Sequence, residues 1–564
     1  MPAMYVLPAN AFETRDEVDP RERKEAERTA YLRREGEKML RAFGNHPSFV
    51  MMTLGNEIGG ERPVMKSLCD HFRTLDQRHL YAQGTNHFHW EPGLQEGDEF
   101  WVSDSTAHDK PLRGSFFQGK YPGHVDNMPP STTVDFSRSI AGVPVPVVGH
   151  ETGQYQVSPD YSEIPKYTGV LRARMLEIFR ERLTAAGMLD QADSFVRASG
   201  ALSVICYRED IEATLRTDGL GGFQLLDLQD FPGQGTALVG ILNAFMESKG
   251  LITPEHWREF CCETVPLLSM KGYTWTTADT FVGRLRVAHY GPVDLTGIGV
   301  AWKVTDEAGR TMRSGKTATA TLIRGKLNEL DLLSFPLSDI PVPQKLMITL
   351  ELPGTPYRNS YPIWVYPAIV DTTPLAGVHV ARAWDESALA VLTAGGKVLL
   401  LPQHSDLKNS IKGSFQCDFW CWPMFKRTAE REKIEVAPGT LGVLCDPEHP
   451  ALAKFPTEFH SNWQWWHLVK QSRPVILDST PADYRPIVQV IDNFARNHKL
   501  GLLFEARVSG GNLLVCTIDL LNHQDKPEAR QFLASILAYM ASADFRPAME
   551  LSAEGIGIVE HSKD

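Results

Sequence analysis

Residues 45–57 of the chain read NHPSFVMMTLGNE. The part from residue 49 to residue 54 is almost wholly apolar, which is typical of a parallel strand that is covered on both faces. A glycine and Asn56 end this run, and Glu57 follows directly beyond it. In folds with parallel strands, functional side chains gather at the carboxyl ends of the strands. Residues 45–57 therefore predict a buried parallel strand with a carboxylate at its functional end.

Similar apolar runs recur on the carboxyl side of this segment, and helical stretches lie between them. The runs are Leu80–Gln83, Phe100–Ser103, Val143–Val148 and Gly222–Leu226. The helical stretches are Arg21–Phe43, Pro63–Leu75, Arg172–Ala185 and Gln191–Cys206. Because alternating strands and helices build a parallel sheet, residues 1–270 predict an α/β domain of the (β/α)8 (TIM) barrel type.

Two further domains are predicted after residue 270. Residues 271–370 show short strands with alternating polar and apolar side chains and hardly any helical periodicity, which is typical of an immunoglobulin-like β-sandwich. Residues 371–564 return to strand–helix alternation and predict a second α/β domain, similar to a glutamine-amidotransferase-like or flavodoxin-like sheet.

The composition of the chain argues against two classes of binding partner. The 564 residues carry a formal net charge of −12, with 43% hydrophobic and 22% charged residues. An acidic surface disfavours nucleic acid and anionic membrane as partners, and no apolar run approaches the roughly 20 residues that span a bilayer. The eight cysteines form no C-x-x-C pair, so we expect buried free thiols rather than a metal site or a disulfide framework.

A second carboxylate stands in the same kind of position as Glu57. Glu151 follows the apolar run 144–148 through Gly149 and His150, again just past the end of a predicted strand. Cleavage of a glycosidic bond needs two such carboxyl groups, one to protonate the leaving oxygen and one to face the anomeric carbon. A glutamate after a strand is more often a surface or helix-capping residue, so either one alone is weak evidence.

Residues 45–57 closely resemble the segment that ends in Asn-Glu on the fourth barrel strand of glycoside hydrolase family 2. Residues 146–153, PVVGHETG, resemble the family's seventh-strand segment. The resemblance implies that Glu57 is the general acid/base, that Asn56 binds the 2-hydroxyl of the sugar, and that Glu151 is the nucleophile. It also implies that the two carboxyl groups face each other at about 5 Å, as retention of configuration requires.

Further substrate-binding residues are predicted at the ends of the other strands, where loop capping is an equal alternative for each. They are Asn86, His87, Asp104, His150, Asp227 and Gln229. Many family members have a tyrosine directly after the nucleophile, but this chain has Thr152, and Tyr155 is the candidate substitute. Trp90 and Trp101 are candidates for stacking on a sugar ring, with a role in the core as an equal alternative. The cluster Trp463, Trp465 and Trp466 is expected to serve domain packing, with a carbohydrate-binding surface as the alternative.

The resemblance starts at about residues 4–7, which look like the third barrel strand. The first two strands, with the family's arginine-and-histidine motif, have no counterpart here. We therefore expect either a truncated gene or a fragment that a separate chain completes. Residues 1–19 show no signal peptide. If the true amino terminus lies elsewhere, a periplasmic or secreted location is open; otherwise the cytoplasm is expected.

The resemblance implies a retaining exo-β-glycosidase, first of all a β-galactosidase, that acts on a glycoside or oligosaccharide. The sequence leaves open whether the chain forms a homo-oligomer. Its chemistry requires no cofactor, although some relatives hold a structural Mg²⁺ or Na⁺ ion. The Asn-x-Lys motif of β-glucuronidases occurs only at Asn497-His498-Lys499, outside the predicted barrel, which disfavours a glucuronide. The alternative is a non-catalytic carbohydrate-binding or assembly protein that derives from such an enzyme.

Overall fold

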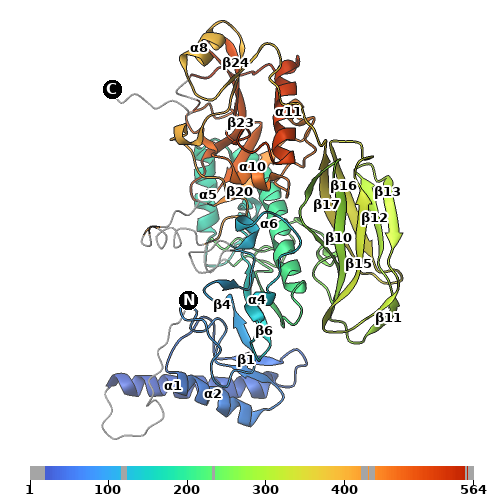
Figure 1. Ribbon diagram of the computed structural model, residues 1–564. Coiled ribbons are helices and arrows are strands. Elements are labelled where there is room, and N and C mark those ends of the chain that lie inside the picture. Colours follow the sequence, from blue (N-terminus) through green and yellow to red (C-terminus); the bar gives the residue numbers. More distant parts are fainter. Residues whose placement is uncertain are drawn as a thin grey trace.

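The computed structural model describes residues 20–115, 123–231, 236–420 and 439–552, together with Glu430, Lys433 and Ile556. The strand predicted at residues 4–7 and Cys421 lie outside these residues. Figure 1 shows an elongated molecule, with the segment around β1 at one end, the carboxyl-terminal sheet at the other, and a β-sandwich beside the middle.

The amino-terminal part is built on parallel strands that follow one another in sequence. They are β1 (Met51–Thr53), β2 (Leu80–Ala82), β3 (Trp101–Ser103), β6 (Val147–Gly153) and β7 (Gly222–Leu226). Strand β1 pairs with β2, and β3 pairs with β6, which pairs with β7. Parallel bridges from Asn56 to Thr85 and from Thr85 to Val102 connect the two groups, so all five strands form one row.

This row is barrel-like, but no closed barrel is found among the described residues, because β1 and β7 do not pair with each other there. A closed barrel of this type needs eight strands with a matched tilt and stagger. Five strands, three of them only three residues long, cannot complete that circle. The sequence predicts a (β/α)8-type barrel that is incomplete at its amino terminus; the described strands form an open row, and the barrel type is not confirmed by them.

Helices connect and cover the strands. They are α1 (Pro20–Phe43), α2 (Arg62–Leu75), α3 (His124–Asn127), α4 (Ser137–Ile140), α5 (Arg174–Ala185), α6 (Ala192–Leu215) and α7 (Pro254–Trp257). Helix α2 begins beside Pro63, whose fixed backbone angle suits the first turn of a helix. Its apolar face, which includes Met65, Leu68 and Phe72, is buried against β1 and β2. A two-stranded hairpin of β4 (Ser105–Ala107) and β5 (Lys110–Pro111) follows β3.

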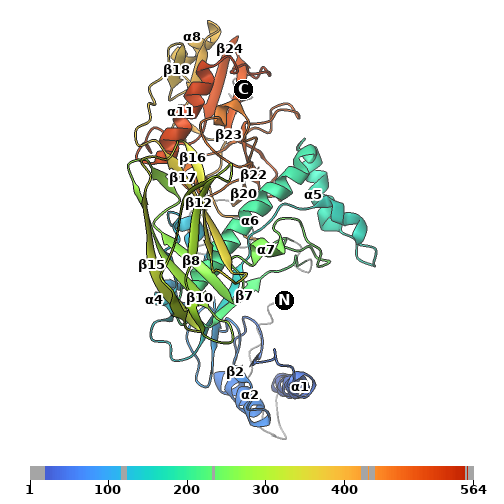
Figure 2. The ribbon, with the colours of Figure 1, turned by 90° about the vertical axis from the view of Figure 1, so that its right-hand side faces the viewer.

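Helix α6 lies between the strand row, the β-sandwich and the carboxyl-terminal domain (Figure 2). Ser203 donates a hydrogen bond of 2.9 Å to the carbonyl of Tyr155, just beyond β6. On another face, Arg208 donates to the side-chain oxygen of Asn359 in the sandwich at 2.6 Å. Polar side chains of α6 therefore bond to both the strand row and the β-sandwich.

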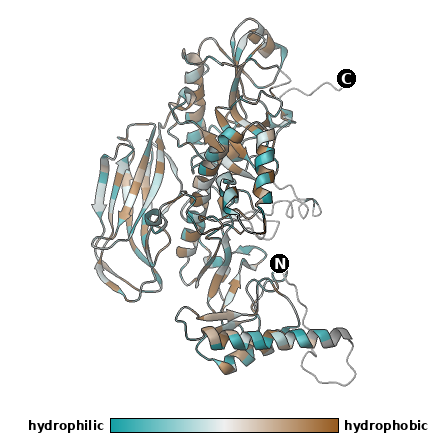
Figure 3. Ribbon diagram, turned by 180° about the vertical axis from the view of Figure 1, so that it is seen from behind, coloured by the Kyte–Doolittle hydropathy of each residue, from teal (hydrophilic) through white to brown (hydrophobic). Residues whose placement is uncertain are grey.

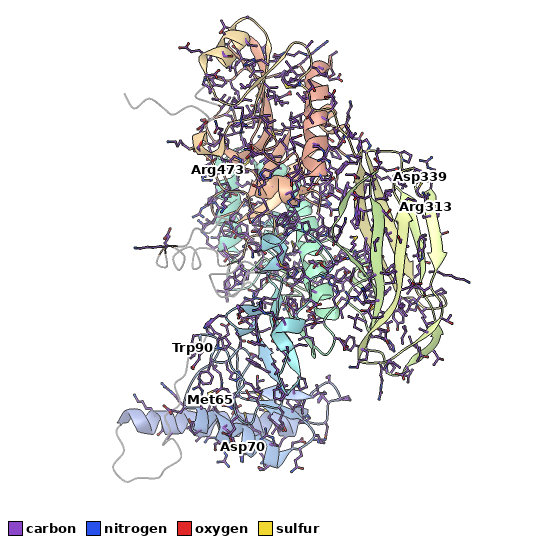
Figure 4. All side chains as sticks on the ribbon, viewed as in Figure 1. Met65, Asp70, Trp90, Arg313, Asp339 and Arg473 are labelled. Atoms are coloured by element: carbon purple, nitrogen blue, oxygen red, sulfur yellow. The ribbon has the colours of Figure 1, made fainter. Side chains whose placement is uncertain are left out.

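The β-sandwich contains sheets with the orders β15-β10-β8, β11-β14 and β13-β12-β16-β17-β9. Its strands are β8 (Thr264–Met270), β9 (Thr274–Thr276), β10 (Thr280–His289), β11 (Leu295–Ile298), β12 (Ala301–Asp306), β13 (Thr311–Lys316), β14 (Ala320–Leu322), β15 (Lys326–Pro336), β16 (Gln344–Glu351) and β17 (Arg358–Tyr366). Apolar and polar residues alternate along these strands (Figure 3). Arg313 and Asp339 form an ion pair on the outer side (Figure 4).

The carboxyl-terminal domain has one sheet in the order β18-β19-β24-β23-β22-β20, with β21 paired to β23. Its elements are β18 (Val378–Ala381), α8 (Glu386–Thr393), β19 (Lys397–Leu400), β20 (Thr440–Cys445), α10 (Trp465–Lys470), β21 (Val475–Ile476), β22 (Val488–Asp492), β23 (Lys499–Val508), β24 (Gly511–Cys516) and α11 (Pro527–Ala541). Only β18, β19 and β24 are parallel neighbours. The sheet is therefore mixed and differs from a wholly parallel flavodoxin-like sheet, because a tight turn at Ser509 and Gly510 makes β23 and β24 antiparallel.

Other sequence expectations concern the interior and the surface. Trp463, Trp465 and Trp466 are buried, with Trp463 stacked on Tyr273, so they pack the domains together. The seven cysteines of the described residues are free thiols. No helix in the described part of the chain is long and apolar enough to cross a membrane.

Candidate active site

Both predicted catalytic glutamates lie at the carboxyl ends of parallel strands, in a backbone conformation that is rare for them. The φ angles are 50° at Glu57 and 50° at Glu151, and Asn86, just beyond the neighbouring strand β2, has a φ of 47°. Residues with a side chain seldom adopt this left-handed region, which costs about 1–3 kcal/mol each. Strain of this kind concentrates at functional sites, where the surrounding structure holds it in place.

A β-bulge explains how Glu151 leaves the regular direction of β6. Gly149 is opposite Phe223, but Thr152 is opposite Leu225, so His150 and Glu151 together face Gln224. An extra residue in one strand bends it and redirects the local side chains. His150 Nδ1 lies 3.0 Å from Gln224 Oε1 across the bulge, which holds the imidazole ring in place.

The bulge and the end of β1 bring the two carboxylates together beside His150. Glu57, His150 and Glu151 each offer a polar atom, and these atoms all lie within 4.8 Å of one another. His150 Nε2 is 3.4 Å from Glu151 Oε1 and 3.9 Å from Glu57 Oε1. Carboxyl groups about 5 Å apart suit a mechanism in which one attacks and the other transfers a proton.

The neighbours of Glu57 include Asn86, as the sequence predicts. Asn86 Nδ2 donates to Glu57 Oε1 at 3.2 Å, while its side-chain oxygen accepts from Ser103 Oγ at 3.3 Å and from the amide of Asp104 at 3.2 Å. The amide group of Asn86 is therefore oriented by the next strand in the row. Asn56 accepts a hydrogen bond of 2.8 Å from Thr85 Oγ1.

Several groups around Glu151 favour its ionised form. Burial by itself raises the pKa of Glu151, but the hydrogen bond and charge of His150, the charge of Arg113 and a hydrogen bond from Asn56 outweigh burial and hold the pKa below its usual range. Gln154 Nε2 lies 3.2 Å from Glu151 Oε2, where it donates a further hydrogen bond. An ionised carboxylate at this position is the form that a nucleophile requires.

Arg113 joins the third acidic side chain to the site. Its guanidinium lies 3.8 Å from Glu151 Oε2 and 4.0 Å from Asp104 Oδ2, and it is almost fully buried. Ser105 Oγ donates to Asp104 Oδ1 at 2.9 Å. Asp104 thus lies at the site, as the sequence predicts, but next to Arg113.

The structure does not bring His87 or Tyr155 to the two glutamates. The imidazole of His87 is fully buried, and its Nε2 lies 3.0 Å from Asp98 Oδ2 in the loop after β2. The hydroxyl of Tyr155 donates to Asp210 of α6 at 3.2 Å, and its ring packs edge-on against Tyr207. Tyr155 therefore does not substitute for the family's tyrosine.

The remaining predicted residues lie along the loop after β7 and in the neighbouring loops. The backbone amide of Asp227 donates to Tyr207 OH at 3.1 Å, and Gln229 forms a parallel bridge with Leu242. No contact of Asp227 or Gln229 with either glutamate occurs in the described part of the chain. Trp101 is buried, whereas Trp90 is 49% exposed and lies on the edge of the β1–β2 part (Figure 4).

Sequence reasoning missed three residues that contact the site. They are Arg113, Gln154 and Trp420. Gln154 has a φ of 66° beside Gly153, where a Cβ would lie 2.0 Å from the Tyr207 ring. A polar residue three positions after the predicted nucleophile was the only visible signal for Gln154. Neither Arg113 nor Trp420 stands at the end of a predicted strand.

Comparison with known proteins gives no activity for the chain by itself. A domain of unknown function (DUF8488) matches residues 279–367, and another (DUF8487) matches residues 379–559. No curated protein matches the chain significantly.

The solved structures that are similar to parts of the chain include glycoside hydrolases. The exo-chitosanase CsxA of Amycolatopsis orientalis is 12% identical, with 60% of this chain and 38% of that chain covered and a TM-score of 0.35. The β-glucuronidase of Parabacteroides merdae is 13% identical, with 62% and 40% covered and a TM-score of 0.25. The chain thus spans less than half the length of either. TM-scores of this size do not establish a shared fold, so the geometry around Glu57 and Glu151 has to carry the functional argument.

Proposed function

We propose that the protein is a retaining exo-β-glycosidase that hydrolyses terminal sugars through Glu57 and Glu151. One observation carries the proposal: carboxylate oxygens of both residues lie within 4.8 Å of each other at the ends of two parallel strands. Inverting enzymes keep their carboxyl groups about 6.5–9.5 Å apart to leave room for a water molecule, whereas retaining enzymes hold them at about 5 Å.

The roles of the two glutamates follow from their surroundings. Glu151, kept ionised by its neighbours, attacks the anomeric carbon while Glu57 donates a proton to the leaving glycosidic oxygen. Glu57, now deprotonated, then takes a proton from a water molecule that attacks the same carbon and releases Glu151. Asn86, which donates to Glu57, and Asn56, which directly precedes Glu57, take the role of binding sugar hydroxyls in this proposal.

A β-galactoside is the first substrate to test. A glucuronide is disfavoured by the position of the Asn497-His498-Lys499 triplet, which lies between β22 and β23 of the carboxyl-terminal sheet. Lys499 Nζ is buried there and donates to Thr480 Oγ1 at 3.2 Å and to the carbonyl of Pro481 at 2.8 Å. A lysine held in this way does not reach a sugar carboxylate at Glu57.

Hydrolysis of a panel of nitrophenyl glycosides tests the proposal. The panel contains β-galactoside, β-glucuronide, β-glucosaminide and β-mannoside, with the anomeric configuration of the first-formed sugar followed by NMR. Release of the β-anomer by the chain supports a retaining β-glycosidase and names the sugar. Sugar binding in calorimetry without turnover of any substrate would instead favour a non-catalytic carbohydrate-binding protein. The open strand row is the observation that supports this alternative.

The pH dependence of hydrolysis is expected to reflect the lowered pKa of Glu151. Activity requires ionised Glu151, so the acidic limb of kcat/KM should have its midpoint below pH 4.5, the ordinary value for a glutamate. Arg113→Met removes one of the favourable charges and should move this limb to higher pH. The exposed Arg284→Met serves as a control and should leave the limb in place. If Arg113→Met leaves the midpoint of the acidic limb at the same pH, the assignment of Glu151 as the nucleophile is contradicted.

A chelator is expected to leave the activity unchanged, whereas added zinc is expected to inhibit it. No step of the proposed mechanism uses a metal, so treatment with EDTA should leave the rate unchanged, which also tests whether a structural Mg²⁺ ion matters. Glu57, His150 and Glu151 offer an N,O,O set that suits Zn²⁺. Added Zn²⁺ should therefore inhibit hydrolysis, and His150→Ala should weaken the inhibition. Activity that disappears with EDTA and returns with Mg²⁺ would contradict the metal-free mechanism.

A further inference from the structure

The segment from Phe415 to Trp420 connects the carboxyl-terminal domain to the end of β6. Near its start, Asp126 Oδ1 of α3 accepts a hydrogen bond of 2.7 Å from the Phe415 amide. In its middle, the amide of Asp418 donates to the carbonyl of Thr440 at the start of β20, at 2.9 Å. The segment is therefore held both by the barrel-like part and by the carboxyl-terminal sheet.

The end of this segment runs antiparallel to the chain that leaves β6. Tyr155 and Phe419 form an antiparallel bridge, and the amide of Gln156 donates to the carbonyl of Asp418 at 3.3 Å. The carbonyl of Trp420 accepts from Thr236 Oγ1 at 2.9 Å. These contacts fix the backbone from Asp418 to Trp420.

A chain of two hydrogen bonds leads from Trp420 to Glu151. The indole Nε1 of Trp420 donates to Gln154 Oε1 at 2.6 Å, and Gln154 Nε2 lies 3.2 Å from Glu151 Oε2. An indole N–H can only donate and an ionised carboxylate can only accept. The amide group of Gln154 therefore has a single orientation that satisfies both neighbours, with its oxygen toward Trp420 and its NH₂ toward Glu151.

We propose that Trp420 is a positioning residue of the glycosidase site, which acts through Gln154 to orient the carboxylate of Glu151. The inference rests on the proposed function and adds a part of the site that lies far away in the sequence. Without the indole N–H, Gln154 Oε1 loses its partner, and the amide is held only through Nε2, which lies 3.2 Å from Glu151 Oε2 and 3.3 Å from the Glu151 carbonyl oxygen. The donor to the carboxylate is then less firmly positioned, which weakens its support of the attacking form.

The proposal makes the carboxyl-terminal domain a part of the catalytic unit. The anchor at Asp126 is reinforced by Lys470 of α10, whose Nζ lies 2.7 Å from Asp126 Oδ2, and by Trp466, whose indole donates to the carbonyl of Val125 at 2.9 Å. The carboxyl-terminal domain supplies both these anchors and Trp420. Its position against the barrel-like part therefore determines how the amide of Gln154 faces Glu151.

Kinetics of Trp420→Phe, Gln154→Ala and the double variant test the relay. Phenylalanine keeps most of the aromatic volume and removes only the indole donor. We expect each single variant to lower kcat by about 10- to 100-fold, with KM changed less than about threefold, and to shift the acidic limb of the pH profile upward. The double variant should be no worse than Gln154→Ala. If the loss of kcat in the double variant equals the product of the losses in the two single variants, the proposal is overturned. Trp302→Phe, in the sandwich, is the matched control and should leave kcat unchanged.

A measurement that needs no turnover separates this inference from the proposed function. With ¹⁵N-labelled tryptophan, the indole resonance of Trp420 is identified by its absence in Trp420→Phe. It should shift with pH as Glu151 ionises, and this shift should disappear in Glu151→Gln and in Gln154→Ala. If the indole resonance of Trp420 shifts with pH in the same way when Glu151 is replaced by glutamine, the connection from Trp420 through Gln154 to Glu151 is wrong, even if the enzyme is active. A relay seen in a chain that hydrolyses none of the glycosides would leave the inference about orientation standing and would reject the glycosidase.

Discussion

Replacing Glu151 by glutamine is expected to lower kcat for the best glycoside on the order of 10⁴-fold, because an amide of the same shape cannot attack the anomeric carbon. Glutamine keeps the volume of the side chain and the same backbone requirement at the bulge, so the fold should persist. Steady-state rates with a nitrophenyl glycoside and a circular dichroism spectrum of the variant check both statements. Glu91→Gln, a change at an exposed glutamate that pairs with Arg62, is the matched control and should retain full activity.

Rescue with azide distinguishes the two glutamates. In Glu151→Gly, azide occupies the vacated space and attacks the anomeric carbon directly, so the product should be the α-glycosyl azide. In Glu57→Ala, Glu151 still forms the covalent intermediate, and azide then displaces it to give the β-glycosyl azide. The same anomer from both variants would show that the assigned roles are wrong.

Replacing Arg216 by methionine is expected to lower the free energy of unfolding by about 3–5 kcal/mol. The guanidinium of Arg216, just after α6, is almost fully buried and donates to Glu209 Oε1 at 2.5 Å and to the carbonyl of Val134 at 2.8 Å. Its Nη1 also lies 3.5 Å from Glu212 Oε2. Methionine fills similar space but leaves two buried carboxylates without this partner. Unfolding in urea measures the loss.

The exposed pair between Arg284 and Glu329 provides the comparison for Arg216. Its partners are 3.5 Å apart and more than half exposed, so Arg284→Met should change the free energy of unfolding by less than about 1 kcal/mol. Equal losses in the two variants would show that burial of the charges around α6 does not determine the stability of this chain.

Strand positions near the site followed closely from the sequence, because continuous apolar runs are a strong local signal. Gly222–Leu226 was predicted with the same bounds as β7, and Leu80–Gln83 differs from β2 by one residue. The absence of a counterpart for the first two barrel strands also pointed to an incomplete barrel, but the pairing of the strands that are present depends on contacts between distant segments and could not be judged in this way.

The two glutamates were found by their motifs, but their surroundings were not. Trp420 lies 266 residues from Gln154 along the chain, and no pattern within a short window connects them. His87 was predicted at the site because it follows a strand, yet its side chain turns away toward Asp98. A strand end predicts where a residue lies but not the direction of its side chain when the backbone adopts a left-handed conformation, as it does at Asn86.

The left-handed backbone at Glu57, Asn86 and Glu151 implies a trade-off between stability and activity. Glycine would relieve the backbone strain at each of these positions, so the least active substitutions there are also the ones that ease folding. Thermostability screens without a selection for turnover would therefore tend to collect inactive variants at these three sites. An engineer who wants a robust glycosidase from this chain should keep them fixed and look for stabilising changes elsewhere.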